Sequence, residues 1–290
     1  MEKQRLSYIY ALSAVFLWSS VATAFKLSLK FLSPLELLFA SALVSWFVLG
    51  FLLVVSGEIK FLNQVSKKQI FYMLSLGVLN PFLYYLVLFK AYDILPAQEA
   101  QALNYTWALS FTYLSAFLLK QKLRWQDVVA GLICYLGVFI IATKGNIFSL
   151  HFENSYGVFL ALLSTILWAL FWIFNSQIKH PILGLFLNFT SGLVFISIAF
   201  MVFGEFRSIE LKGLLGAIYV GFFEMGFTFF LWLQALRYTQ SHSKTANLIF
   251  LSPFLSLVFI SIFLKEAILP STIMGLILII SALLFQQKAK

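Results

Sequence analysis

Charge is scarce in this chain. Asp, Glu, Lys and Arg make up 11% of the 290 residues, whereas hydrophobic side chains make up 61%. A soluble domain is roughly a quarter charged, so the composition excludes an ordinary water-soluble domain. The mean hydropathy of +0.94 instead indicates a chain that lies mostly in a lipid bilayer.

Cysteine and histidine are also rare. Cys134 is the only cysteine, which excludes an intramolecular disulfide and a thiolate metal cluster. The histidines His151, His180 and His242 lie far apart in or beside loops, so we expect neither a metal nor a cofactor. The chain contains no GxSxG, HExxH or P-loop motif. We therefore expect that the protein is not an enzyme and uses no ATP.

Long apolar runs fill the chain, with short breaks between them. A helix of about 20 apolar residues crosses a bilayer, and a backbone in lipid must satisfy its polar groups internally. The expected fold is an all-α integral membrane protein with ten transmembrane helices. Pro81 and Pro253 fall inside runs and should kink them. The predicted spans are 8–25, 34–55, 69–89, 97–119, 126–143, 156–177, 182–203, 213–235, 245–264 and 268–285.

The stretch 103–145 returns in altered form at 247–285. Lys120 aligns with Lys265, a separation of 145 residues and close to half of the chain. Such a period predicts two halves that are built alike. Because five spans per half is an odd number, the second half should enter the membrane from the opposite side, giving two inverted five-helix repeats. The two halves are 1–145 and 146–290.

Both copies resemble the end of the repeat unit in the EamA-type family of the drug/metabolite transporter superfamily. In that family an apolar helix with a proline precedes a Gly-Glu-like break and a Gly-rich closing helix. The second copy fits with Pro253 and Glu266, whereas the first has Ala108 and Gln121 at those places. The resemblance covers nearly the whole chain. It implies a secondary transporter that exports small organic metabolites, amino acids or similar, by alternating access.

Other functions stay open from the sequence. Within transport, the alternative is a flippase for a lipid or polyprenyl carrier, and outside transport it is a membrane-embedded enzyme or scaffold. The partners expected are a small-molecule substrate and the bilayer, for a monomer or homodimer. The net charge of +9 is spread over short loops, so we expect no nucleic-acid partner.

Lys and Arg are distributed unevenly between the two sides of the predicted bundle. Thirteen of the twenty fall in segments on the side of the N-terminus, and seven fall on the other side. Cytoplasmic segments of membrane proteins carry an excess of cations. This bias predicts a multi-pass protein of the cell (inner) membrane with both termini in the cytoplasm.

Glu224 is the only ionisable residue near the centre of a predicted span. A carboxyl group in hydrocarbon is costly and usually marks a path for substrate or ions. A protonated glutamic acid that binds a neighbouring helix would be the structural alternative. Glu224 lies 144 residues after Asn80, and Thr228 lies 144 residues after Tyr84. We expect these four residues to contact substrate, with a proton as the candidate coupling ion.

Aromatic and polar residues of other spans complete the predicted site. Trp18 in the first span corresponds to Trp168 in the sixth, and Asn104 and Trp107 should share one face of the fourth. Lys26 is a candidate for binding a substrate carboxylate, the alternative being a lysine that snorkels to the interface. Many aromatic residues of such a chain instead face lipid or form interfacial belts. The site should lie in a cavity walled by the first, third, fourth, sixth, eighth and ninth helices, with the fifth and tenth outside.

Overall fold

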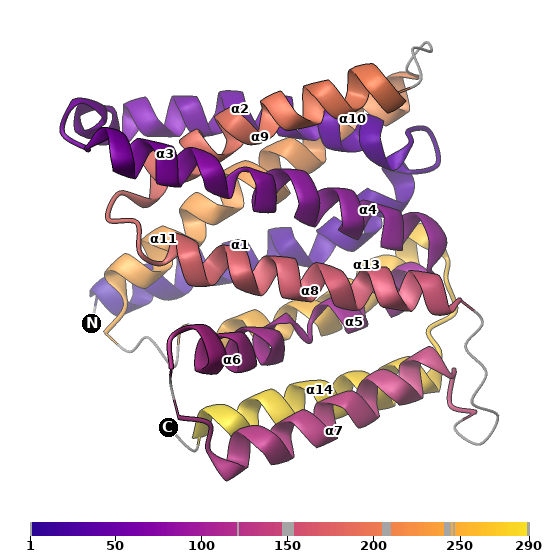
Figure 1. The fold of residues 1–290 in the computed structure, drawn as a ribbon. Helices are drawn as coiled ribbons and strands as arrows, with labels where there is room; N and C mark the ends of the chain where they lie inside the picture. Colours follow the sequence, from indigo (N-terminus) through magenta and orange to yellow (C-terminus); the bar gives the residue numbers. More distant parts are fainter. Residues whose placement is uncertain are drawn as a thin grey trace.

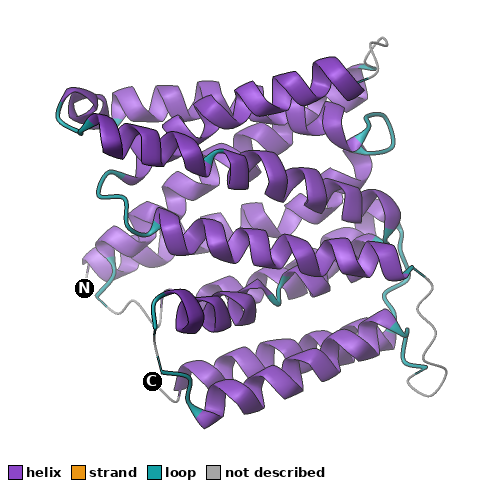
Figure 2. Ribbon diagram, viewed as in Figure 1, coloured by secondary structure: helices purple, strands orange, loops and turns teal. Residues whose placement is uncertain are grey.

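Every regular element that the computed structural model describes is a helix (Figure 2). This confirms the predicted all-α class. Some residues used above lie outside the described part of the chain: Gln121, His151 and His242, together with three of the counted cations, Arg207, Lys244 and Lys290. The structure describes residues 2–120, 122–146, 154–204, 210–240, 245 and 247–288.

The first half begins with two long helices whose ends are defined by local signals. Pro34 opens the second helix, and Ser33 and Glu36 form a capping box in which Ser33 N donates to Glu36 Oε2 at 2.6 Å. The elements are α1 (Glu2–Ser28), α2 (Pro34–Val55), η1 (Glu58–Asn63), α3 (Lys67–Leu76), η2 (Val78–Leu83), α4 (Tyr84–Ile94), α5 (Ala97–Asn104), α6 (Trp107–Leu118) and α7 (Trp125–Ala142).

The second half follows the same order of long and bent helices. Pro181 opens its second helix as Pro34 does in the first half. The elements are α8 (Ser155–Asn175), α9 (Pro181–Phe203), α10 (Leu211–Tyr219), η3 (Val220–Phe227), α11 (Thr228–Tyr238), η4 (Asn247–Leu251), α13 (Ser252–Phe259), η5 (Ile260–Leu264) and α14 (Pro270–Lys288).

Within the described residues, seven continuous helical segments are long and apolar enough to cross a membrane: α1, α2, α7, α8, α9 and the two bent segments Lys67–Ile94 and Leu211–Tyr238. The apolar helices Leu248–Leu264 and Pro270–Gln286 are shorter. The predicted span 97–119 is not one continuous helix, because the chain turns at Tyr105 and Thr106 between α5 and α6. There the Thr106 hydroxyl donates to the Leu103 carbonyl at 2.9 Å. A threonine side chain that binds a nearby carbonyl competes with the helical pattern. The protein is nevertheless multi-pass, and the regular elements of its described residues are all helical.

Two long helices bend at corresponding places. The continuous segments Lys67–Ile94 and Leu211–Tyr238 have 28 residues each. α3 and α10 start 144 residues apart, and so do α4 and α11. The bends are the π-helical segments η2 and η3. As predicted, Pro81 lies at a kink, where Asn80 has non-helical angles of φ −145° and ψ 121°.

Contacts between helices recur in pairs. α1 packs on α11 and α13, and α8 packs on α4 and α6. η3 contacts α2, and η2 contacts α9. α2 and α9 also pack on each other. Each main contact of one half therefore has a counterpart in the other.

α7 and α14 lie side by side at one edge of the bundle (Figure 1). Their close approach depends on small residues, because a Cβ atom on Gly137 would lie 2.6 Å from the Gly275 carbonyl oxygen. These two helices are the predicted fifth and tenth spans, which the sequence places outside the site.

Candidate functional site

Glu224 is buried in η3, with 8% of its surface exposed. Its Oε1 accepts a hydrogen bond of 3.2 Å from the hydroxyl of Tyr85. Tyr85 lies in α4 directly after the bend at η2, and it is fully buried. The two bent helices therefore meet through a carboxyl group and a phenol in the interior of the protein.

Tyr84 connects this contact to an aromatic cluster. Its ring packs edge-on against Tyr85, with centroids 4.7 Å apart, and stacks on Trp168 of α8 at 4.4 Å. Stacked and edge-to-face pairs each stabilise by about 0.5–1.5 kcal/mol beyond the area that they bury. Tyr84 thus holds α8 against α4 beside Glu224.

Phe229 is the centre of the aromatic cluster. Its ring centroid lies 5.7 Å from that of Trp18 and 6.0 Å from those of Trp168 and Trp172. Only 2% of its surface is exposed. Trp18 and Trp168, which occupy corresponding positions in the two halves of the sequence, therefore both contact the ring of Phe229.

Three predicted polar residues of these bent helices and of α5 are buried or half-buried. Asn104 donates to Ser164 of α8 at 3.0 Å. Thr228 and Asn80 are fully buried, and their side-chain polar atoms make no hydrogen bond within the described residues. An unsatisfied buried polar group costs about 1–3 kcal/mol. These groups are therefore suited to a polar ligand.

Two predicted site residues are held differently from what the sequence indicates. The Lys26 ammonium donates to the carbonyls of Tyr92 and Leu95 at 2.6 and 2.7 Å, and to that of Asp93 at 3.3 Å. Lys26 thus caps the end of α4, where cations are favourable. Trp107 opens α6 and does not share a helix with Asn104, because the turn at Thr106 separates them.

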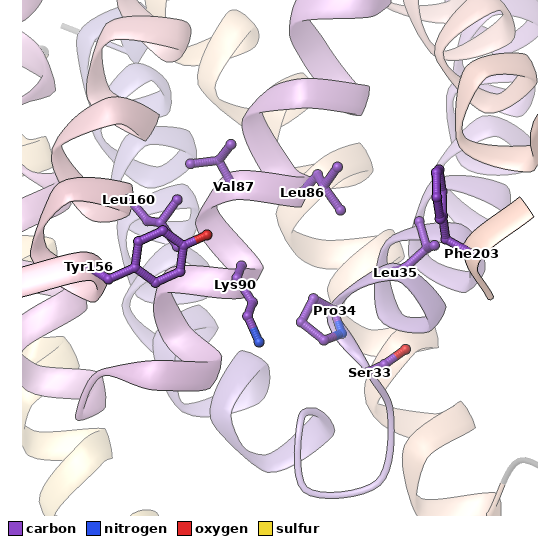
Figure 3. A pocket seen from close by; sticks show the side chains of 9 residues that line it. All are labelled: Ser33, Pro34, Leu35, Leu86, Val87, Lys90, Tyr156, Leu160 and Phe203. Atoms are coloured by element: carbon purple, nitrogen blue, oxygen red, sulfur yellow. The ribbon is translucent and has the colours of Figure 1, made fainter. Parts of the chain in front are cut away.

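Pockets open at opposite ends of α8. The larger, of about 370 Å³, is lined by the beginnings of α2 and α8, by α4 and by the end of α9, with Lys90 among its residues (Figure 3). The smaller, of about 170 Å³, lies near the end of α8 and contacts Trp172, Phe229 and Trp232. Neither pocket is lined by α7 or α14, as predicted. However, α2 and α9 line them, and these helices are the second and seventh predicted spans, which the expected cavity walls did not include.

Tyr85 and Phe229 were not among the predicted site residues. Both are buried aromatics, and they are separated by 144 residues, as are Asn80 and Glu224. The alignment that pairs Asn80 with Glu224 also pairs the residues five positions later in each helix, which are Tyr85 and Phe229. Their aromatic type alone carries no such signal in a chain in which 18% of residues are aromatic.

The fold and site define a multi-pass helical membrane protein whose two bent helices meet at a buried carboxyl group. The model of the EamA-like transporter family matches residues 5–143 and again 155–286, so the chain belongs to this family. Membership implies a small-molecule substrate and a lipid bilayer environment.

Relatives extend over most of the chain. A Bacillus subtilis (strain 168) protein, described as the uncharacterized transporter YxxF, is 24% identical over 234 residues, covering 80% of this chain and 74% of its own. An uncharacterized transporter of Archaeoglobus fulgidus is 22% identical over 271 residues, covering 92% of this chain and 93% of its own. A crystal structure with 16% identity has a similar fold, with a TM-score of 0.65 over 98% of this chain and 99% of that one.

Proposed function

We propose that the protein is a secondary transporter that exports small polar organic metabolites, amino acids or similar, by alternating access. Its two units are residues 1–145 and 146–290, arranged as inverted five-helix repeats of a ten-span protein. The family assignment supports transport. The repeated order of long and bent helices, and the paired helix contacts, support the two-unit arrangement.

The observation that carries this proposal is the contact between Tyr85 and Glu224. It places an ionisable carboxyl group, 8% exposed, between the bent helices of the two units. Intramembrane carboxyl groups are expensive and mark substrate or ion pathways. A group held between two units can exchange its partner when the units move relative to each other.

Glu224 would bind either the ammonium group of an amino acid or a coupling proton. Tyr84, Trp18 and Trp168 would form the aromatic walls around the cargo, which also attract cations. The polar groups of Asn80, Asn104 and Thr228 would complete the hydrogen bonds of the cargo. The substrate would supply hydrogen bonds to buried polar groups that have no partner within the described residues. Binding a polar molecule would therefore remove the free-energy cost of leaving these groups unsatisfied.

The proposed location is the cell (inner) membrane, with both termini in the cytoplasm. It rests on the excess of Lys and Arg in the segments on the side of the termini. α1 begins and α14 ends at the same end of the bundle (Figure 1), as an even number of crossings requires.

The direct test compares the metabolites released by cells that make the wild-type protein, the Glu224→Gln variant or no protein. We expect one or a few amino acids or related polar molecules to accumulate outside only with the wild type. Release of a lipid or lipid-linked molecule instead would favour the flippase alternative. Identical profiles in all three cells, with the wild-type protein shown to be inserted, would contradict the proposal.

A further inference from the structure

A row of side chains along α8 runs from one pocket to the other. Tyr156 and Leu160 line the larger pocket, and Trp172 lines the smaller one. Ser164 and Trp168 lie between them at the same spacing of four residues, so each of these residues neighbours the next along a row that winds slowly around the helix. Ser164 binds Asn104, and Trp168 stacks on Tyr84. The candidate site therefore lies along a line between the pockets.

The larger pocket is amphipathic. Leu86, Val87 and Leu160 form apolar walls, and Lys90 lies one turn further along α4, between Tyr156 and Pro34 (Figure 3). Among the described residues that line the pocket, Lys90 is the only charged one. Its volume of about 370 Å³ lies in the range of small-molecule sites, which is roughly 300–1,000 Å³.

Lys90 can change partners at little cost. Its Nζ lies 2.7 Å from Asp93 Oδ2, and the two side chains are 46% and 34% exposed. An ion pair exposed to this degree stabilises a protein by about 1 kcal/mol or less. Lys26, the cation proposed above to meet a substrate carboxylate, is instead bound to three backbone carbonyls.

We propose that the pocket around Lys90 is one mouth of the substrate path, and that Lys90 binds an anionic group of the cargo there, such as a carboxylate. This inference rests on the proposed transport function. A carboxylate at Lys90 would leave the remainder of the cargo against Val87 and Leu160. The row of α8 side chains that contains Leu160 and Ser164 would then lead the cargo from this mouth to Trp168 and Tyr84.

Thiol labelling tests the charge of the pocket without knowledge of the cargo. The lone cysteine is removed by Cys134→Ala, and Val87→Cys places a thiol in the pocket, one turn from Lys90. The rates of modification by an anionic reagent, 2-sulfonatoethyl methanethiosulfonate, and by a cationic one, its trimethylammonioethyl counterpart, are then compared. Lys90→Gln should lower the anionic-to-cationic rate ratio by roughly threefold or more, since a unit charge at this range acts on both reagents.

Lys30→Gln is the matched control, because Lys30 is an exposed cation at the same end of the bundle but does not line the pocket. Lys30→Gln should leave the anionic-to-cationic rate ratio equal, within error, to that of the protein that carries only Cys134→Ala and Val87→Cys. An unchanged ratio in Lys90→Gln, or an equal fall in both variants, would overturn the assignment of Lys90 as the anion-binding group.

A transport measurement tests the mouth itself. Proteoliposomes loaded with a mixture of radiolabelled common amino acids should lose label with the wild type and with Lys30→Gln, and several-fold more slowly with Lys90→Gln. Equal rates in all three would contradict a role of this pocket in the path. If the wild type moves no amino acid while the labelling ratios differ as expected, the proposed cargo fails but the anion-binding pocket stands.

Discussion

The hydroxyl of Tyr85 donates a hydrogen bond of 3.2 Å to Oε1 of Glu224. The register that pairs Glu224 with Asn80 also pairs Tyr85 with Phe229, each 144 residues apart. Phenylalanine has no hydroxyl, so this hydrogen bond has no counterpart in the other half. In agreement, the amide of Asn80 makes no hydrogen bond within the described residues. The aligned positions of the two halves therefore differ in chemistry here.

Replacing Glu224 by Gln removes the titratable proton and the negative charge but keeps the size of the side chain and an acceptor for Tyr85. We expect export to fall at least roughly tenfold, because a coupling or ammonium-binding carboxyl group acts through its charge. Exchange of cargo across proteoliposome membranes separates the coupling role from the ammonium-binding role. Glu224→Gln should still exchange cargo if Glu224 couples transport to protons, and it should lose exchange if Glu224 binds the cargo. Near-normal export by correctly inserted Glu224→Gln would show that the residue is structural.

Replacing Phe229 by Leu should loosen the aromatic cluster, because Trp18, Trp168 and Trp172 all contact this ring. We expect a loss of about 1–3 kcal/mol in the free energy of unfolding. Thermal unfolding in detergent measures it. Phe71→Leu is the control, because Phe71 is an exposed ring of the other bent segment, 73% accessible, and it should change stability little.

Lys26→Met should lower stability rather than change substrate affinity. The variant leaves three carbonyls near the end of α4 without their cation, and a hydrogen bond to a charged group contributes about 1.5–3 kcal/mol when it is well shielded. Because Lys26 is partly exposed, we expect a total loss of about 1–2 kcal/mol. Lys30→Met controls for the lost charge. A Lys26→Met protein of wild-type stability and reduced affinity for its cargo would support substrate binding by Lys26 instead.

Gly275→Ala should separate α7 from α14. A Cβ atom there would lie 2.5 Å from Cγ1 of Ile141 and 2.6 Å from the Gly137 carbonyl oxygen, and such overpacking costs about 1–3 kcal/mol. The measurement is the midpoint of thermal unfolding. Gly50→Ala is the matched control, because its Cβ would meet only the ring of Phe186, at 3.3 Å and beyond. Similar midpoints for the two variants would argue against tight packing of this helix pair.

The proposed topology predicts that reporters fused after Gln287 and within 146–154 lie on opposite sides of the membrane. An odd number of crossings separates these positions if 156–177, 182–203, 213–235, 245–264 and 268–285 all span. Phosphatase and fluorescent-protein fusions report the two sides directly. Activity of the same reporter at both positions would exclude the ten-span arrangement.

The sequence by itself determined the helical class, most helix positions and the kink at Pro81. These features depend on local physics, since apolar runs in lipid must satisfy their backbone internally and proline cannot donate a hydrogen bond. The separation of 144 residues between Asn80 and Glu224 also matches the starts of α3 and α10. Glu224 was identifiable because a carboxyl group in an apolar run is conspicuous.

Only the tertiary structure decided which side chains meet. Tyr85 touches Glu224 over a separation of 139 residues, and Lys26 reaches carbonyls 66 to 69 residues away. A soluble helix shows its inner face by its apolar stripe, whereas helices in lipid are apolar on their outer faces as well. The sequence of this chain therefore marks where helices lie but not how each is rotated. That rotation, set by packing between distant helices, brought Phe229 rather than Trp107 into the aromatic cluster.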